Sequence, residues 1–438
     1  MQKLLSVLLS VCAVLSGLFA QMIPVKAPAD PGEFTPVLRF IAASDTHVQA
    51  FEAKGTVRIR KMLRLGEAIA RADAAYDRLD AVLIAGDLTD NGRKDQFNGF
   101  YAAVKSCLPA ETQFLGVVAR AHDGWTMDRK TAHEYYTSLT GNAPDFHTVI
   151  GGYHFIGLSA SDNDDVHYDE GQVAWLRAQL EEATAEDPLK PVFVMHHEHV
   201  RDTVYGSTAF DGWGETFFSD VLKDFPQVVD FSGHSHYPLN DPRSLWQGAF
   251  TAVGTGAIHY AEFTVDDVRT YHPDDRGAVA TCWIVEADAD NRVRLRGLDI
   301  LAGEYLCDYI LENPADPANR DYTPEKRAAA SRPPVFPADA AIGTARLGHT
   351  LKLTVPAAAS ADGMPVVLYR AFLVNEAGET VAKTWTLPAY YVAGEQKTVS
   401  LSLELPAAGR FTVRVTAETA YGKQSAALEA QVGADALC

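Results

Sequence analysis

Short apolar runs alternate with longer segments of helical periodicity from about residue 37 to residue 300. The apolar runs span residues 37–43, 81–86, 114–119, 154–160, 191–195 and 228–233. Runs of this length bounded by polar turns are typical of buried strands. The helical positions are Ile59, Met62, Leu63 and Ile69 after the first run, and Val173, Leu176 and Leu180 after the fourth. This order predicts an α/β domain with a largely parallel central sheet.

The pattern changes in the last third of the chain. Residues 312–337 are rich in proline and charge and have no sustained period, which predicts a linker. After it, short strand-like runs such as TLKLTV and GRFTVRVTAET are separated by Gly, Asn and Pro turns. We expect residues 338–438 to form a β-sandwich similar to immunoglobulin or fibronectin type III modules, more often a spacer or attachment module than a catalytic one.

The N-terminal residues have the pattern of a secretory signal peptide. One lysine precedes an apolar run from Leu4 to Ala20, and cleavage after Ala20 or Ala27 fits the small residues there. We therefore predict a signal peptide over residues 1–27 and a secreted, periplasmic or cell-surface protein. An uncleaved membrane anchor is the alternative, because the apolar run is long for a signal; after cleavage we expect no stable membrane span.

Composition limits the classes of partner and the state of the cysteines. The 438 residues carry a formal net charge of −19. An acidic surface argues against binding to nucleic-acid polymers, but a local metal or arginine still permits a small phosphorylated substrate. The cysteines outside the predicted signal are Cys107, Cys282, Cys307 and Cys438. Export permits disulfides in any of three pairings, and free buried thiols fit equally well.

Histidine and aspartate follow five of the predicted strands. The segments are Asp45-Thr46-His47, GDLTDNG at 86–92, Arg120-Ala121-His122-Asp123, His196-His197 and GHSH at 233–236. Strand ends are where α/β folds place their sites, and imidazoles and carboxylates are the ligands that zinc, iron and manganese prefer. Each segment alone is also compatible with an ordinary polar turn. Their order and placement together indicate a metal site.

This series of motifs resembles the calcineurin-like metallophosphoesterases over roughly residues 36–305. The resemblance implies a four-layer αββα core with two packed sheets for residues 28–311, and a pair of metal ions, manganese, iron or zinc, at the strand ends. It implies hydrolysis of phosphomonoesters or phosphodiesters by attack of a metal-bound hydroxide. We find neither G-x-S-x-G nor a P-loop, which disfavours the hydrolase classes that rest on those motifs.

The resemblance also assigns ligands to positions of this chain. The first metal would be held by Asp45, His47, Asp87 and His236. The second would be held by Asp87, His196 and His234, with Asp87 bridging the two ions. His196 is preferred to His197 because the family ligand lies two residues before a frequent proline, a position that Glu198 occupies here.

The loop at residues 120–123 departs from the family pattern, which is Gly-Asn-His followed by Asp or Glu. His122 would assist the leaving group and Asp123 would orient it. Ala121 stands where the family has an asparagine that ligates the second metal, so this site is one ligand short. Three protein ligands and water still describe many catalytic zinc sites. Arg120 replaces the glycine and is a candidate phosphate clamp, a solvated loop charge or a partial substitute for the second ion.

Three functional hypotheses follow. The first is a secreted metal-dependent phosphatase or phosphodiesterase acting on a small phosphorylated substrate. The second keeps the enzyme and leaves its substrate open among nucleotides, phospholipid head groups and phosphoproteins. The third, motivated by Ala121, is a weakened or inactive homologue that acts as an extracellular binding protein, contacting glycans or the cell surface through its C-terminal domain.

Overall fold

The computed structural model describes residues 34–49 and 54–434. The predicted signal peptide at residues 1–27 and Cys438 lie outside these ranges. The chain divides into two compact units, and the division in sequence falls between Asp321 and Tyr322. The short segment Asp241–Arg243 is grouped with the second unit. This division falls inside the predicted linker at residues 312–337. That tract forms a 3-10 turn at Pro317–Asn319 and helix α7 (Pro324–Ala330), which begins after the N-cap Thr323.

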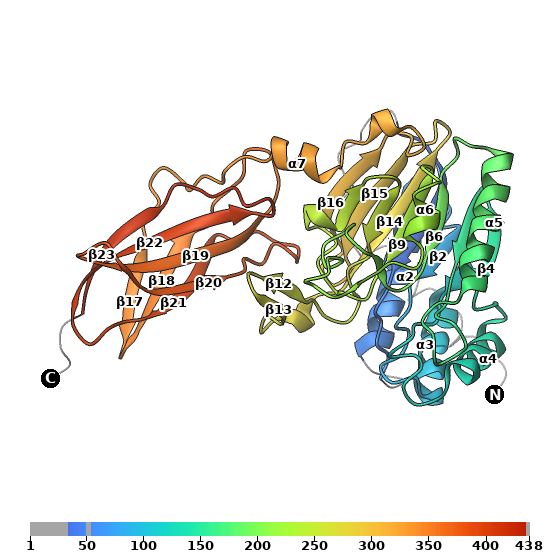
Figure 1. The fold of residues 1–438 in the computed structure, drawn as a ribbon, viewed down its shortest axis with the longest axis horizontal. Coiled ribbons are helices and arrows are strands. Elements are labelled where there is room, and N and C mark those ends of the chain that lie inside the picture. The colour runs from blue at the N-terminus through green and yellow to red at the C-terminus, as the bar shows by residue number, and fades with distance from the viewer. Residues whose placement is uncertain (1–33, 50–53, 435–438) are drawn as a thin grey trace, which may run out of the picture. The chain divides into compact units, whose positions relative to one another are not determined.

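The first unit is built on two six-stranded sheets (Figure 1). The first sheet has the order β16-β15-β14-β1-β2-β3. Its strands are β1 (Pro36–Ala43), β2 (Ala81–Ile84), β3 (Gln113–Gly116), β14 (Thr281–Asp288), β15 (Val293–Asp299) and β16 (Glu304–Leu311). The first three strands run parallel, whereas β14, β15 and β16 continue the sheet in antiparallel pairs.

The second sheet repeats this mixed arrangement, with the order β10-β11-β9-β6-β5-β4. Its strands are β4 (Phe146–Ile150), β5 (Tyr153–Gly157), β6 (Val192–Met195), β9 (Val228–Ser232), β10 (Leu245–Gln247) and β11 (Thr251–Gly254). The four inner strands are parallel and the two edge strands are antiparallel. Each of the six apolar runs is a strand, as predicted. The alternation of strands and helices does not reveal which strands pair, but the two packed sheets that the family resemblance implies are present.

Helices cover the outer face of each sheet and complete four layers. They are α2 (Lys54–Ala72), α3 (Lys94–Cys107), α4 (Arg129–Thr140), α5 (Glu170–Glu186) and α6 (Ser219–Leu222). Ile59 and Met62 of α2 pack on the first sheet, and Leu176 and Leu180 of α5 pack on the second. Figure 1 shows α5 lying along the sheet that contains β4 and β6. The αββα architecture is thereby confirmed.

Aromatic side chains join the inner faces of the two sheets. Phe40 of β1 is fully buried, and its ring centroid lies 5.2 Å from Phe155, 4.8 Å from Phe193 and 5.8 Å from Phe231. Edge-to-face contacts of this kind add to the hydrophobic gain of burial. The inner faces thus hold the two sheets in one fixed register, and the ends of β1, β6 and β9 are positioned together.

Smaller elements complete the first unit. The paired strands β7 (His199–Val200) and β8 (Gly214–Glu215) follow β6, β12 (Phe263–Val265) pairs with β13 (Val268–Tyr271), and Arg276–Ala278 form a 3-10 turn. Cys107 and Cys282 are free thiols. None of the helices in the described ranges combines the length and apolarity needed to cross a bilayer.

The second unit is an antiparallel β-sandwich. One sheet has the order β17-β18-β21 and the other β20-β19-β22-β23. The strands are β17 (Gly343–Leu347), β18 (Thr350–Pro356), β19 (Val366–Asn375), β20 (Thr380–Thr386), β21 (Thr398–Glu404), β22 (Gly409–Thr419) and β23 (Leu428–Ala434). Leu353, Tyr369, Leu401 and Val413 lie in its buried core. The predicted β-sandwich is confirmed.

We expect Phe40→Ala to lower the free energy of unfolding of the first unit by about 3–5 kcal/mol, because it leaves a cavity among three phenylalanines. Val37→Ala, on the same strand but at a side chain that is 37% exposed, is the control. Urea titration measures both variants. A loss below about 1 kcal/mol for Phe40→Ala would contradict the role of this contact between the sheets.

Candidate metal centre

Five strand ends bring histidine and aspartate side chains together in the first unit. β1, β2 and β3 supply their loops from one sheet, and β6 and β9 supply theirs from the other. Within the described residues, three groups of side chains have potential ligand atoms that all lie within 4.8 Å of one another. One consists of His47, Asp90 and His122, and the other two share Asp87. We name the union of the two that share Asp87 the His–Asp cluster: Asp45, His47, Asp87, His197, His234 and His236.

The backbone at these positions adopts an uncommon conformation. Five cluster residues have positive φ: Asp45 (53°), His47 (41°), Asp87 (49°), His234 (71°) and His236 (58°). L-residues avoid this left-handed region at a cost of about 1–2 kcal/mol each. The amide of His47 donates to the Asp87 carbonyl at 3.1 Å, and the amide of His234 donates to Asp45 Oδ2 at 3.1 Å. The two sheets therefore hold each other's loops in this strained form.

Two glycines permit the close approach of these loops. Gly86 has φ 82°, and a Cβ there would lie 2.6 Å from His197 Nδ1. A Cβ on Gly233 would lie 2.4 Å from Ser44 Oγ and 2.5 Å from Asp45 Oδ2. No side chain fits at either position, which explains why glycine precedes Asp87 and His234.

The first group combines Asp45, His47, Asp87 and His236, and all four are buried. His236 Nε2 lies 3.1 Å from Asp45 Oδ1, and His47 Nε2 lies 3.6 Å from Asp87 Oδ2. The Nε2 atoms of His47 and His236 face each other at 3.0 Å. His236 Nδ1 lies 3.2 Å from the Tyr260 carbonyl, so this nitrogen carries a proton and Nε2 is the atom available to a further proton or a cation.

The second group combines Asp87, His197 and His234. His197 Nε2 lies 3.3 Å from Asp87 Oδ2 and 3.1 Å from His234 Nδ1. His197 Nδ1 donates to the Ala85 carbonyl at 2.8 Å, so Nε2 is the nitrogen that faces Asp87 and can take up a proton or a cation. Asp87 belongs to both groups and lies between them.

The structure brings His197 rather than the predicted His196 to the cluster. His196 turns to the opposite side of β6, where its Nε2 lies 3.0 Å from Asp230 Oδ1 of β9. Side chains alternate along a strand, and Phe193 faces the inter-sheet layer, so His197 has the same orientation and His196 faces the helices. The candidate ligand is corrected accordingly.

The carboxylates of the cluster are held ionised. Burial raises the pKa of Asp87, but His197 and His47 outweigh it and bring this pKa to about 2. Burial also opposes ionisation of Asp45, and His236 and His47 hold its pKa well below the usual range. The Oδ1 atoms of both residues are buried and receive no hydrogen bond from the described residues. Buried lone pairs of this kind fit cation binding.

The loop after β3 places His122 beside the cluster. Its Nε2 lies 4.0 Å from Asp87 Oδ2, and its Nδ1 lies 2.7 Å from the Asp90 carbonyl. The imidazole ring is 4.4 Å from that of His47 between centroids. His122 is 24% exposed, so solvent or a ligand can reach it. The preceding Ala121 is half-buried and Arg120 is exposed.

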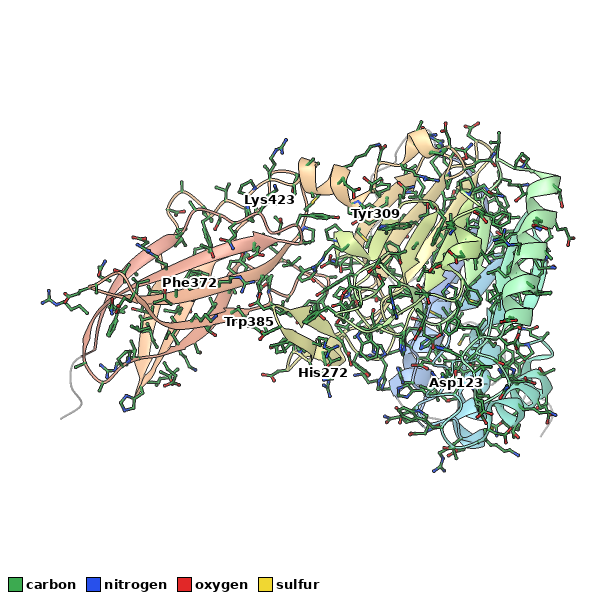
Figure 2. All side chains as sticks on the ribbon, viewed as in Figure 1. Asp123, His272, Tyr309, Phe372, Trp385 and Lys423 are labelled. Atoms are coloured by element: carbon green, nitrogen blue, oxygen red, sulfur yellow. The ribbon has the colours of Figure 1, made fainter. Side chains whose placement is uncertain are left out.

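Asp123 does not orient His122, contrary to the prediction. Its buried carboxylate accepts hydrogen bonds from the amides of Leu88 (3.2 Å), Thr89 (2.9 Å) and Ala119 (3.0 Å), and from Thr89 Oγ1 (2.7 Å). Burial and the charge of Asp87 raise its pKa to about 6. Asp123, labelled in Figure 2, thus ties the loop after β3 to the loop after β2, and the Asp90 carbonyl orients His122 instead.

Residues 38–238 match the sequence model of the calcineurin-like phosphoesterases. A probable cyclic nucleotide phosphodiesterase from Rhodococcus erythropolis is 25% identical over 231 residues, 51% of this chain and 72% of that protein.

Two solved structures are similar at lower identity. A purple acid phosphatase from yellow lupin (Lupinus luteus) seeds has 14% identity and a TM-score of 0.45, over 62% of this chain and 53% of its own. GAP50, the anchor in the inner membrane complex of Plasmodium, has 13% identity and a TM-score of 0.43, over 63% of this chain and 89% of its own. This chain therefore spans about half of the lupin enzyme.

The matched segment includes every residue of the His–Asp cluster and the five strand ends that carry the cluster and His122. Over this segment the chain is similar to the calcineurin-like phosphoesterases.

Proposed function

We propose that this protein is a metal-dependent hydrolase of small phosphoesters, with the His–Asp cluster as its active centre. The observation that carries the proposal is Asp87, a buried carboxylate kept ionised between two groups of imidazoles. The match of residues 38–238 to the calcineurin-like phosphoesterases supports the same class of chemistry. Phosphomonoesters and phosphodiesters are both candidate substrates.

The donor set fits two divalent cations. The first ion would be held by Asp45, His47, Asp87 and His236, and the second by Asp87, His197 and His234. Two pairs of imidazole nitrogens face each other, His47 with His236 at 3.0 Å and His197 with His234 at 3.1 Å. The lone pairs of two such nitrogens repel unless at least one nitrogen binds a proton or a cation, so this arrangement favours metal coordination. Nitrogen and carboxylate ligands suit manganese, iron and zinc. Such ions supply Lewis acidity, which draws charge from phosphoryl oxygens and acidifies water.

His122 would act at the leaving oxygen of the substrate. The Asp90 carbonyl can only accept, so Nδ1 of His122 carries a proton in either charge state. In the imidazolium form Nε2 also carries a proton, which it can donate to an alkoxide as the phosphorus–oxygen bond breaks. Asp123 is a positioning residue, because it fixes the loop that carries His122.

Arg120 is proposed to bind a phosphate oxygen. Its exposure at the start of the same loop supports this role, and the planar guanidinium suits phosphate geometry. The loop also motivates the alternative function, an extracellular binding protein with a weakened centre, because the methyl group of Ala121 offers no ligand to the second ion. We also propose that the protein is secreted or located at the cell surface. The second unit would then contact glycans or the cell surface.

Chelation should abolish phosphoesterase activity, and manganese or zinc should restore it. Asp87→Asn should lower kcat roughly 100-fold or more and reduce the bound metal, because one carboxylate serves both ions. Asp95→Asn, which removes an exposed carboxylate in α3, is the matched control. Metal analysis and turnover of p-nitrophenyl phosphate and its diester measure both effects. Full turnover in metal-free protein would overturn the mechanism.

The adjacent histidines provide a direct test of the ligand assignment. His197→Ala should remove the second ion and most activity, whereas His196→Gln should keep both ions, because His196 faces Asp230. His196→Gln keeps a hydrogen-bonding partner for the buried Asp230, which limits the loss of stability. Metal stoichiometry by mass spectrometry distinguishes them. Loss of an ion in His196→Gln alone would return the assignment to His196.

The loop after β3 gives two separable effects. Ala121→Asn should lower the metal concentration for half-activation, because it adds an amide oxygen near the second ion. Arg120→Ala should raise KM roughly tenfold or more, since one charge-assisted hydrogen bond contributes ~1.5–3 kcal/mol. A metal titration and a substrate titration of each variant measure them. If neither quantity moves, the loop has no part in binding metal or phosphate.

A further inference from the structure

Trp125 is an exposed aromatic side chain next to the candidate catalytic histidine. Its side chain is 60% exposed, more than Phe210 at 50% and Phe217 at 37%, the other exposed phenylalanines and tryptophans of the described chain. Its ring centroid lies 4.0 Å from that of His122, with an angle of 39° between the planes. An indole that leaves most of its surface in water at such a place gains little from folding.

The segment that carries Trp125 is rigidly held. The Gly124 amide donates to the Ala121 carbonyl at 2.9 Å, and Thr126 Oγ1 donates to the Asn91 carbonyl. Asp123, directly before Gly124, accepts four hydrogen bonds. Gly92 packs so closely on this segment that a Cβ there would lie 2.4 Å from the Asp123 carbonyl oxygen. The indole is therefore preorganised, and a ligand that stacks on it would lose little affinity to ordering of the loop.

We propose that Trp125 is a substrate-binding residue that stacks on a planar aromatic group in the alcohol part of the phosphoester. This rests on the proposed function, in which the phosphate lies beside Asp87 and the leaving oxygen faces His122. Trp125 contacts His122, beside which the leaving oxygen and its alcohol would lie. Aromatic stacking accepts any flat ring, so a nucleobase and an aryl group share the required chemistry.

The position of His122 also sets the minimum distance between the aromatic ring and the phosphate of such a substrate. It contacts Trp125 on one side and comes within 4.0 Å of Asp87 Oδ2 with its Nε2 atom. A ring that stacks on Trp125 while its phosphate lies beside Asp87 must therefore pass His122. A sugar between ring and phosphate provides this length, which favours nucleoside phosphates over phenyl phosphates.

The test uses two pairs of phosphonates, whose phosphorus–carbon bond resists hydrolysis, with the manganese-loaded full chain. The first pair is the 5′-methylenephosphonates of adenosine and of ribose, which differ only in the base. The second is 2-phenylethylphosphonate and 2-cyclohexylethylphosphonate, which differ only in aromaticity. Calorimetry gives Kd for each compound. Variants are Trp125→Ala, Trp125→Phe and, as a control on another exposed ring, Phe210→Ala.

We expect the aromatic member of at least one pair to bind about 5- to 150-fold more tightly in the wild type, the range found for one base on one aromatic ring. The pair that shows the gain identifies the base or the aryl group. Trp125→Ala should abolish the gain, Trp125→Phe should keep most of it, and Phe210→Ala should not change it. Thermal unfolding and metal content confirm that each variant is folded and loaded.

Equal affinities within both pairs in the wild type would overturn the proposal, without reliance on any variant. A gain that persists in Trp125→Ala would also overturn it. If the manganese-loaded wild type prefers the aromatic phosphonate but hydrolyses no phosphoester, the proposed hydrolysis is contradicted while the stacking on Trp125 stands. Absence of binding by all four compounds would overturn both.

Discussion

The site in the first unit is arranged around two buried carboxylates, Asp45 and Asp87, which stay ionised although they are shielded from solvent. Imidazoles surround both, and the hydrogen bonds that they receive leave one oxygen of each free. An uncompensated buried charge costs several kcal/mol, so this arrangement is stable only with protons or cations among the rings. The left-handed backbone of five cluster residues adds to the cost. Strain and buried charge at one place are typical of a functional site.

The two-sheet architecture makes this concentration of charge feasible. Phe40, Phe155, Phe193 and Phe231 pack the inner faces together, and three of the strands that carry them, β1, β6 and β9, end at the cluster. Hydrogen bonds then cross between the sheets, as from the His234 amide to Asp45. Neither sheet alone positions both groups of ligands. The packing of the core thus provides the free energy that holds the ligand loops in conformations they would not adopt in isolation.

The sequence predicts the strands, the β-sandwich and the five loops of the site, because each leaves a local pattern of apolar runs and polar turns. It does not distinguish His196 from His197. Both faces of β6 are buried, so VFVM is equally apolar on both and its inward face cannot be identified. The only local signal is Asp230, a lone carboxylate in the apolar β9 that pairs with His196. The role of Asp123 is equally hidden, since its donors come from residues 88, 89 and 119 in two loops that meet only in the fold.

The loop after β3 has alanine where the family has a metal-ligating asparagine, yet its backbone is held by several hydrogen bonds. The hydrogen bonds help to decide what the alanine means for the site. A loop that had drifted after losing its function would be expected to lose its internal contacts as well. Here Asp123 keeps four hydrogen bonds, His122 keeps its contact with the Asp90 carbonyl, and Gly92 keeps the close approach. The alanine at position 121 would therefore leave a second ion one ligand short, within a loop that holds His122 Nε2 4.0 Å from Asp87 Oδ2. Such an arrangement fits a change in metal affinity or substrate preference better than decay of the site.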